Sequence, residues 1–273
     1  MKTKKVKLKN GLRINIFDSS SIKSYKNSTT IIFIHGGTGS LLNWKYQLFY
    51  FARKYRTVAY DWRGCGQSDD SKSYTFDDHY SDFLELIKIL KISEKPILVA
   101  HSYGCLIARR FINENEVDKF INVSLGVNNG LGFFLRFLLS LPKFIKRPLY
   151  RWFLTPRNPI FTKYFIASKK TPLHKIKECL DDNRLQSLDF FVALKTFRKK
   201  EALGWMERCQ NKLLMISGRE DKRMKPRMIR KIRRFIPEAR IEVIQDAGHM
   251  IPIENPLDFN NLIENFIKID KEY

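Results

Sequence analysis

A short apolar strand that ends on a serine and leads at once into a helix constrains this chain more than any other feature. The stretch is PILVAHSYGCLIARRF, residues 96–111. Ile97–Ala100 are apolar, as in a buried strand, and helical spacing begins just after Ser102. Ala100 and Gly104 flank the serine two residues away on each side, where strand and helix almost touch. The stretch is either an ordinary turn with a serine cap or a turn that exposes a reactive hydroxyl.

Short apolar strands alternate with helical segments along most of the sequence. The expected strands are a hairpin around Asn10-Gly11 (KVKLKNGLRINIF), followed by TTIIFI, RTVAY, PILVA, FINVSLGV, KLLMISG and RIEVIQ. Helices are expected around residues 44–53, from Thr75, after Ser102, from about Pro226 and from Leu257. This alternation predicts an α/β protein with a mostly parallel sheet that helices cover on both faces.

The helix from Thr75 has a clear start and one apolar face. Thr75 and Asp78 have the spacing of a capping box, and Phe83 and Ile87 fall on one side of the helix. On this pattern His79 is expected at the surface, in contact with solvent.

The alternation breaks in the middle of the chain. This break predicts a core formed by residues 1–126 and 210–273 and an inserted helical cap, or lid, at residues 127–209. The longest apolar run, LGFFLRFLLSL, has 11 residues and contains Arg136, whereas a membrane span needs about 20. The first ten residues are basic with no apolar run behind them, so no signal peptide is expected.

Net charge indicates which partners to expect, and the cysteines indicate the redox environment. The chain carries a formal net charge of +22, which favours anionic partners such as nucleic acid, acidic lipid or acidic substrates. An alternative is that Lys and Arg are simply tolerated on the surface. The four cysteines show no CxxC pair and no metal-ligand spacing, so reduced thiols, a cytoplasmic location, and no metal or cofactor are expected.

Polar groups follow four of the predicted strands. Ser102 is one, and Asp221 in SGRED and His249 in DAGHM are two others. The fourth is the glycine-rich stretch HGGTGS, residues 35–40, whose backbone N–H groups are suited to face an oxyanion. Carboxyl ends of parallel strands meet at one edge of a sheet, so these groups are expected to lie close together. The order Ser, Asp, His along the chain is the order of a nucleophile-elbow hydrolase.

With these motifs the chain resembles the α/β-hydrolase superfamily. The resemblance covers roughly residues 5–126 and 210–270, and the motifs FIHGG, DWRGCGQSD, AHSYG, SGREDK and DAGHMIPIENP stand in family order. The elbow is usually Gly-x-Ser-x-Gly, so Ala100 departs mildly from the pattern. An insertion at residues 127–209 usually forms a helical cap over the acyl pocket in this superfamily.

The resemblance implies a role for each matching residue. Ser102 would be the nucleophile, His249 its base, and Asp221 the acid that orients the imidazole. The oxyanion hole would be formed by the backbone N–H groups of Gly37 and Tyr103. Ser rather than Asp at position 102 disfavours the dehalogenase and epoxide-hydrolase branches.

Several neighbouring residues have structural interpretations instead. Glu220 competes with Asp221 for the acid role, because both lie in one loop, and the family register favours Asp221. His101 is expected to pack away from the reaction, and His35 to order the HGG loop. We expect Asp61 and Arg63 to brace loops and Cys65 and Cys105 to be buried thiols. None of these four side chains is expected to react.

The expected function is hydrolysis of a carboxylic ester, with a lipid-like acyl ester or thioester as the more specific hypothesis. Residues 126–170 hold nine basic residues, no acidic one and seven phenylalanines, which favours a lid that meets an apolar substrate at an anionic membrane. The structural alternative is that these aromatics pack inward. Peptidase, thioesterase and carbon–carbon hydrolase activities stay open, as does a ligand- or partner-binding protein with little turnover. Nucleic-acid binding lacks a recognisable module, and the oligomeric state is not encoded in these patterns.

Overall fold

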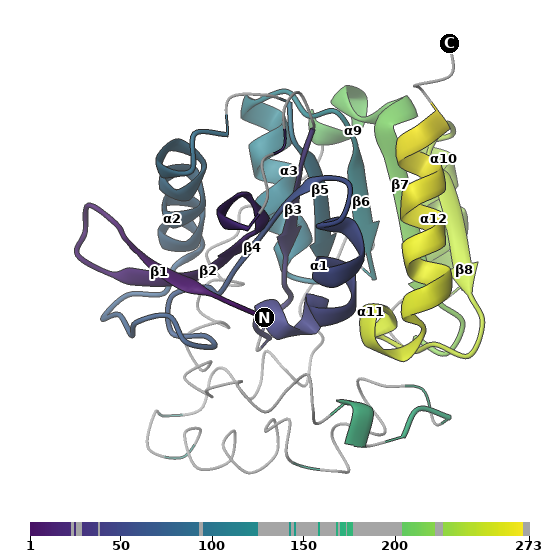
Figure 1. The fold of residues 1–273 in the computed structure, drawn as a ribbon. Coiled ribbons are helices and arrows are strands. Elements are labelled where there is room, and N and C mark those ends of the chain that lie inside the picture. Colours follow the sequence, from purple (N-terminus) through teal and green to yellow (C-terminus); the bar gives the residue numbers. More distant parts are fainter. Residues whose placement is uncertain are drawn as a thin grey trace.

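The fold centres on one eight-stranded sheet with the strand order β1-β2-β4-β3-β5-β6-β7-β8 (Figure 1). In this computed structural model the strands are β1 (Lys4–Lys7), β2 (Arg13–Asp18), β3 (Thr30–Ile34), β4 (Arg56–Tyr60), β5 (Ile97–His101), β6 (Phe120–Val123), β7 (Leu213–Gly218) and β8 (Arg240–Ile244). The pairs β1–β2 and β2–β4 are antiparallel, and all other pairs, from β4 to β8, are parallel. The predicted hairpin and the mostly parallel sheet are both confirmed.

The structure describes most of the predicted core and little of the predicted insertion. The described residues are 1–22, 25, 29–37, 39–92, 95–124, 142, 145, 158, 168, 170–172, 174–176, 204–221 and 226–269. The predicted cap, residues 127–209, therefore lies outside the described residues except for a few positions and the segment from residue 204.

Side chains alternate between the two faces of the sheet and form two separate apolar cores. On β3, Ile32 and Ile34 belong to one core, whereas Ile31 and Phe33 belong to the other. Successive side chains of a strand point to opposite faces, so a strand covered on both sides must be apolar throughout. This is why the central strands read as continuous apolar runs rather than as alternating ones.

Helices from distant parts of the sequence cover each face (Figure 1). The first core takes side chains from α2 (Phe76–Ile89), α3 (Gly104–Glu114), α9 (Gly204–Arg208) and α10 (Pro226–Phe235). The second takes them from α1 (Lys45–Phe51), α11 (Ile251–Glu254) and α12 (Pro256–Lys268). Three short 3₁₀ helices, η1 (Ser19–Ser21), η2 (Leu41–Trp44) and η5 (Gln210–Lys212), complete the described elements. Among the described helices, none is both long and apolar enough to cross a lipid bilayer.

The expected helix starts are confirmed where the structure describes them. Thr75 is the N-cap of α2, and its side chain and that of Asp78 satisfy each other's backbone N–H groups as a capping box. The helices expected from about Pro226 and Leu257 begin at Pro226 and Pro256. Proline suits a helix start because its missing N–H would have no intrahelical partner there.

Candidate active site

Ser102 stands on a strained turn between β5 and α3. Its φ is +48°, a left-handed conformation that a residue with a Cβ adopts only at a cost. The turn is held because the Ser102 N–H donates to the carbonyl of Val123 at 2.9 Å. Ser102 stays partly exposed while Ala100 before it is fully buried. The turn is thus the sharp strand-to-helix elbow that the sequence predicted.

Gly104 lets the helix after the elbow approach the neighbouring strand. A Cβ at this position would lie 2.5 Å from the carbonyl oxygen of Ile34 and 2.6 Å from that of His35. Both oxygens belong to backbone at the end of β3, so neither can move aside as a flexible side chain would. The small residue expected two positions after Ser102 is therefore required by the packing.

We expect Gly104→Ala to displace the elbow and to lower both stability and the reactivity of Ser102. Overpacking of this kind costs about 1–3 kcal/mol. The matched control is Gly11→Ala, because Gly11 has φ +86° but open space around it, so the change strains a distant turn without touching the elbow. Urea unfolding and fluorophosphonate labelling report the two effects. Equal labelling of the two variants would contradict this role of Gly104.

His249 and Asp221 meet at the carboxyl ends of strands β7 and β8. His249 follows β8 and Asp221 follows β7, and the imidazole Nδ1 lies 2.9 Å from the Asp221 Oδ2. Both residues are buried, at 5% exposure each. Glu220, the alternative acid, is half-buried and donates its backbone N–H to the carbonyl of Ala247. Of these two acids, Asp221 is the one whose carboxylate contacts the ring nitrogen.

His101 has a role that sequence reasoning missed. Its Nε2 donates to the carbonyl of His249 at 2.8 Å, and the two ring centroids lie 4.8 Å apart. A Cβ on Gly36 would lie 2.8 Å from the His101 Nδ1 and 3.3 Å from the Ser102 Cβ. His101 therefore joins the nucleophile turn, the loop of His249 and the glycine-rich loop. The sequence holds no local signal for a contact between residues so far apart.

The glycine-rich loop after β3 is fixed by His35. The His35 Nδ1 donates to the carbonyl of Gly36 at 2.7 Å, and its Nε2 accepts the backbone N–H of Trp62 at 3.2 Å. Burial holds the pKa of His35 down at about 3, so the ring is neutral at neutral pH. His35 thus orders this loop, as expected. Gly37, the predicted oxyanion donor, is partly exposed in the same loop, which lies against Ser102 through Gly36.

The prediction that His79 is exposed to solvent is wrong. His79 is 3% exposed, its Nδ1 lies 2.9 Å from the hydroxyl of Tyr103, and its ring stacks on Trp62. Burial lowers the pKa of His79 to about 3. His79 precedes Phe83 by four residues, so the buried face of α2 extends one turn further toward its start than the apolar pattern indicated. His79 therefore braces the side chain of the residue that follows Ser102.

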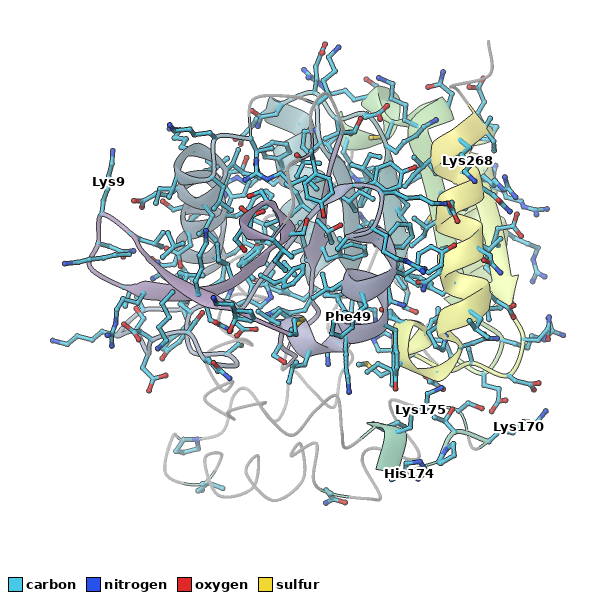
Figure 2. The ribbon with its side chains drawn as sticks, viewed as in Figure 1. Lys9, Phe49, Lys170, His174, Lys175 and Lys268 are labelled. Carbon is cyan, nitrogen blue, oxygen red and sulfur yellow. The ribbon has the colours of Figure 1, made fainter. Side chains whose placement is uncertain are left out.

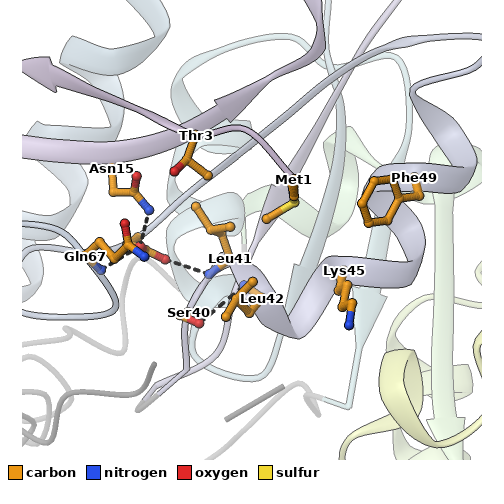
Figure 3. Close-up of a pocket in the computed structure, with 10 residues that line it drawn as sticks. Met1, Thr3, Asn15, Ser40, Leu41, Leu42, Lys45, Phe49 and Gln67 are labelled. Atoms are coloured by element: carbon orange, nitrogen blue, oxygen red, sulfur yellow. Dashed lines mark hydrogen bonds between the residues drawn. The ribbon is translucent and has the colours of Figure 1, made fainter. Parts of the chain in front are cut away.

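Asp61 supports the glycine-rich loop from the other side, next to a small cavity. Its carboxylate accepts N–H groups from Leu41 at 2.7 Å, Gln67 at 3.0 Å and Asn15 at 2.7 Å. A cavity of about 290 Å³ lies beside these contacts (Figure 3). It is lined by Met1, Thr3, Asn15, Ser40, Leu41, Leu42, Lys45, Phe49, Asp61 and Gln67. The buried Arg63 pairs with Asp82 at 2.6 Å. Asp61 and Arg63 therefore both brace loops, as expected.

The described residues offer little for a metal. Within the part of the chain that the structure describes, no group of three or more His, Cys, Asp or Glu side chains is arranged to hold an ion. The described thiols of Cys65, Cys105 and Cys209 are free, and burial raises their pKa, to about 12 for Cys105 and Cys209. These thiols are therefore protonated and poor nucleophiles at neutral pH.

Comparison with known proteins matches most of the chain to one family. A family model described as the alpha/beta hydrolase fold matches residues 29–256. Epoxide hydrolase 3 of Xenopus tropicalis is 25% identical over 271 residues, which cover 90% of this chain and 73% of that relative. Epoxide hydrolase 1 of Caenorhabditis elegans is 40% identical over only 96 residues, or 33% of this chain and 24% of that relative.

Solved structures agree on the fold. A carboxylesterase structure from the thaumarchaeon Nitrososphaera gargenis matches with a TM-score of 0.78 and 21% sequence identity. The match covers 98% of this chain and 99% of that one. At such an identity the likeness shows the arrangement of strands and helices, and the chemistry has to be argued from the residues at the strand ends.

Proposed function

This chain belongs to the α/β-hydrolase family, and we propose that within it the chain is a serine hydrolase that cleaves a carboxylic ester through an acyl-enzyme intermediate. The observation that carries the proposal is the positive φ of Ser102 at the elbow, next to strand ends that hold the His249–Asp221 pair. A strained serine, an imidazole and a carboxylate at the carboxyl ends of strands of one parallel sheet are the groups that acyl transfer requires.

In the proposed first step, His249 removes the proton of Ser102 while the serine oxygen attacks the ester carbonyl. The Asp221 contact to Nδ1 favours the tautomer with the proton on Nδ1, which leaves the Nε2 lone pair free to act as the base. The imidazolium then gives its proton to the leaving alkoxide, so the ester C–O bond breaks and an alcohol departs. Water, activated by the same imidazole, cleaves the acyl-enzyme and returns the free acid.

The proposed oxyanion hole consists of the backbone N–H groups of Tyr103 and Gly37. Tyr103 directly follows the nucleophile, and its buried side chain is fixed by His79. Gly37 lies in the loop that His35 and Asp61 brace. Fixed donors of this kind stabilise the charge that develops on the carbonyl oxygen, and losing one typically costs about 2.7–4 kcal/mol of barrier.

Epoxide opening is the second candidate, because relatives with the name epoxide hydrolase match this chain. The serine argues against it on chemical grounds. Attack of a Ser102 alkoxide on an epoxide would form an ether, which has no carbonyl for an activated water to attack. The covalent intermediate would therefore not turn over. Peptidase and carbon–carbon hydrolase activities, or a binding role with little turnover, remain compatible with the same side chains.

For the substrate we propose an apolar acyl ester or thioester, taken up by a cytoplasmic protein at an anionic membrane surface. The support is the composition of residues 126–170, which carry nine basic residues, seven phenylalanines and no acidic residue. Each basic residue near an anionic surface contributes about 1 kcal/mol of attraction. A lid of this composition would bring the pocket to a substrate that is poorly soluble in water and resides in the membrane.

We expect p-nitrophenyl esters of medium or long chain to be preferred over acetate, and binding to anionic vesicles at low salt. Replacing Arg147 and Arg151 together by Glu should weaken vesicle binding. The same change at Arg233 and Arg234, which are exposed on α10, serves as the matched control. An acetate optimum without vesicle binding, or equal losses for both pairs, would contradict the lid proposal and leave a small-ester hydrolase.

A further inference from the structure

Glu254 lies buried at the end of α11, close to the base but outside the triad. Its Oε2 accepts the backbone N–H of Gly248 at 2.9 Å, and its Oε1 accepts that of Met250 at 2.7 Å. These two N–H groups stand immediately before and after His249 in the chain. One carboxylate thus holds both sides of the residue that we assign as the base.

The peptide that follows His249 is fixed from two directions. Its carbonyl oxygen accepts the His101 Nε2 at 2.8 Å, and its N–H, that of Met250, donates to Glu254. A peptide plane held at both its oxygen and its nitrogen cannot rotate without breaking a contact. The direction of the His249 side chain is set by this plane together with the Asp221 contact.

The same carboxylate also binds a second segment of the chain. The backbone N–H of Ser168 and the hydroxyl of Thr171, the latter at 3.1 Å, both donate to the Glu254 Oε2. We call residues 168–176, of which the structure describes all but 169 and 173, the clamp segment. It lies in the predicted insertion, far in sequence from the loop of His249.

Further contacts dock the clamp segment on this loop. The ammonium of Lys175 donates to the carbonyl of Glu254 at 3.3 Å, and Lys170 forms an ion pair with Asp246. The fully buried Ile176 packs in one cluster with Met250 and Ile253. In Figure 2 the side chains of Lys170 and Lys175 are labelled beside α11 and the end of β8. The clamp segment and the loop of His249 therefore share polar and apolar contacts.

We propose that Glu254 is a positioning residue for His249, and that it transmits the docking of the clamp segment to the catalytic base. The inference rests on the proposed function for its catalytic consequence. When the clamp segment is docked, four donors surround the carboxylate and keep it ionised and fixed. When that segment undocks, Oε2 loses two donors, and the hydrogen bonds from Glu254 to the peptides around His249 weaken.

The electrostatics of Glu254 agree with this role. Burial raises the pKa of the Glu254 carboxyl, whereas the N–H groups of Ser168, Gly248 and Met250 and the Thr171 hydroxyl lower it. Burial is the larger effect, so the anion depends on these donors. A carboxylate in this balance responds to the loss of one donor more strongly than a solvated one would.

The test compares Glu254→Gln, Thr171→Val and the double variant with wild type, in the full chain. The amide of Gln presents an NH₂ group to donors that need an acceptor, while its size is unchanged. Glu238→Gln is the matched control, because Glu238 is exposed. We expect Glu254→Gln to lower kcat about 100-fold with KM nearly unchanged, since a small misplacement of a catalytic group has that effect. Thr171→Val should lower kcat by less, and in the Glu254→Gln background it should have no further effect.

Hydrogen exchange of the Gly248 and Met250 amides supplies a readout that needs no activity. Both amides should exchange faster in Glu254→Gln, and Gly248 should exchange faster in Thr171→Val, with the rest of the core unchanged. Unchanged exchange at both amides would overturn the proposal, as would additive kcat losses in the double variant or a loss of protection spread over the whole core. If wild type neither hydrolyses esters nor reacts with a fluorophosphonate, the proposed function fails, while the exchange data still decide the role of Glu254.

Discussion

Ser102→Ala is expected to lower ester turnover by about 10⁶-fold, the scale found when the nucleophile of a serine hydrolase triad is removed. The hydroxyl is the atom that forms the acyl-enzyme, and no other described side chain at the elbow offers a replacement. The neighbouring Cys105 has a thiol that is fully buried, with its pKa raised to about 12. Steady-state hydrolysis of a p-nitrophenyl ester measures the loss.

Ser124→Ala is the matched control for this substitution. Ser124 directly follows the neighbouring strand β6 and also has a positive φ, +57°, so both changes remove a hydroxyl from a residue in the left-handed conformation. Any loss of activity that came only from backbone strain would appear in both variants. We expect Ser124→Ala to keep most of the activity. Comparable losses in both would remove Ser102 from the nucleophile role.

Asp221→Asn is expected to lower kcat by about 10⁴-fold while the fold is retained. The Asn side chain can present an N–H to the His249 Nδ1, which favours the tautomer with its proton on Nε2. That tautomer cannot accept the proton of Ser102. The imidazolium formed during attack would also lose the carboxylate that lies 2.9 Å from its Nδ1.

Glu220→Gln separates this effect from a general change of charge in the same loop. Glu220 is half-buried and directly precedes Asp221, so the substitution removes one negative charge within a residue of the proposed triad acid. We expect it to change kcat by less than about threefold, because the carboxylate that contacts the imidazole of His249 is that of Asp221. If Glu220→Gln were the damaging change and Asp221→Asn the mild one, the acid role would pass to Glu220.

The elbow and the alternation of strands and helices could be predicted because their causes are local. A continuous apolar run indicates a strand covered on both faces, and small residues at 100 and 104 indicate the close approach that the Gly104 contacts display. The capping box at Thr75 and Asp78 is likewise a short-range pattern. Each of these signals lies within a few residues of the feature that it predicts.

The supporting contacts of the site could not be predicted, because they join residues that are distant in sequence. His101 reaches the carbonyl of a residue 148 positions away, and Glu254 reaches Ser168 across 86 positions. The burial of His79 could not be predicted for a related reason: a histidine on the edge of an apolar face is compatible with either solvent or a buried partner. Only the approach of Tyr103 and Trp62 decides between them.

The claim that Ser102 is the nucleophile can be tested by mass spectrometry of the protein after treatment with a fluorophosphonate. The proposed mechanism predicts one adduct in wild type, located on the peptide that contains Ser102. It predicts no adduct in Ser102→Ala, and slower formation in Asp221→Asn than in Glu220→Gln. A folded wild-type protein that gains no adduct, or an adduct that forms equally in wild type and Ser102→Ala, would contradict the claim.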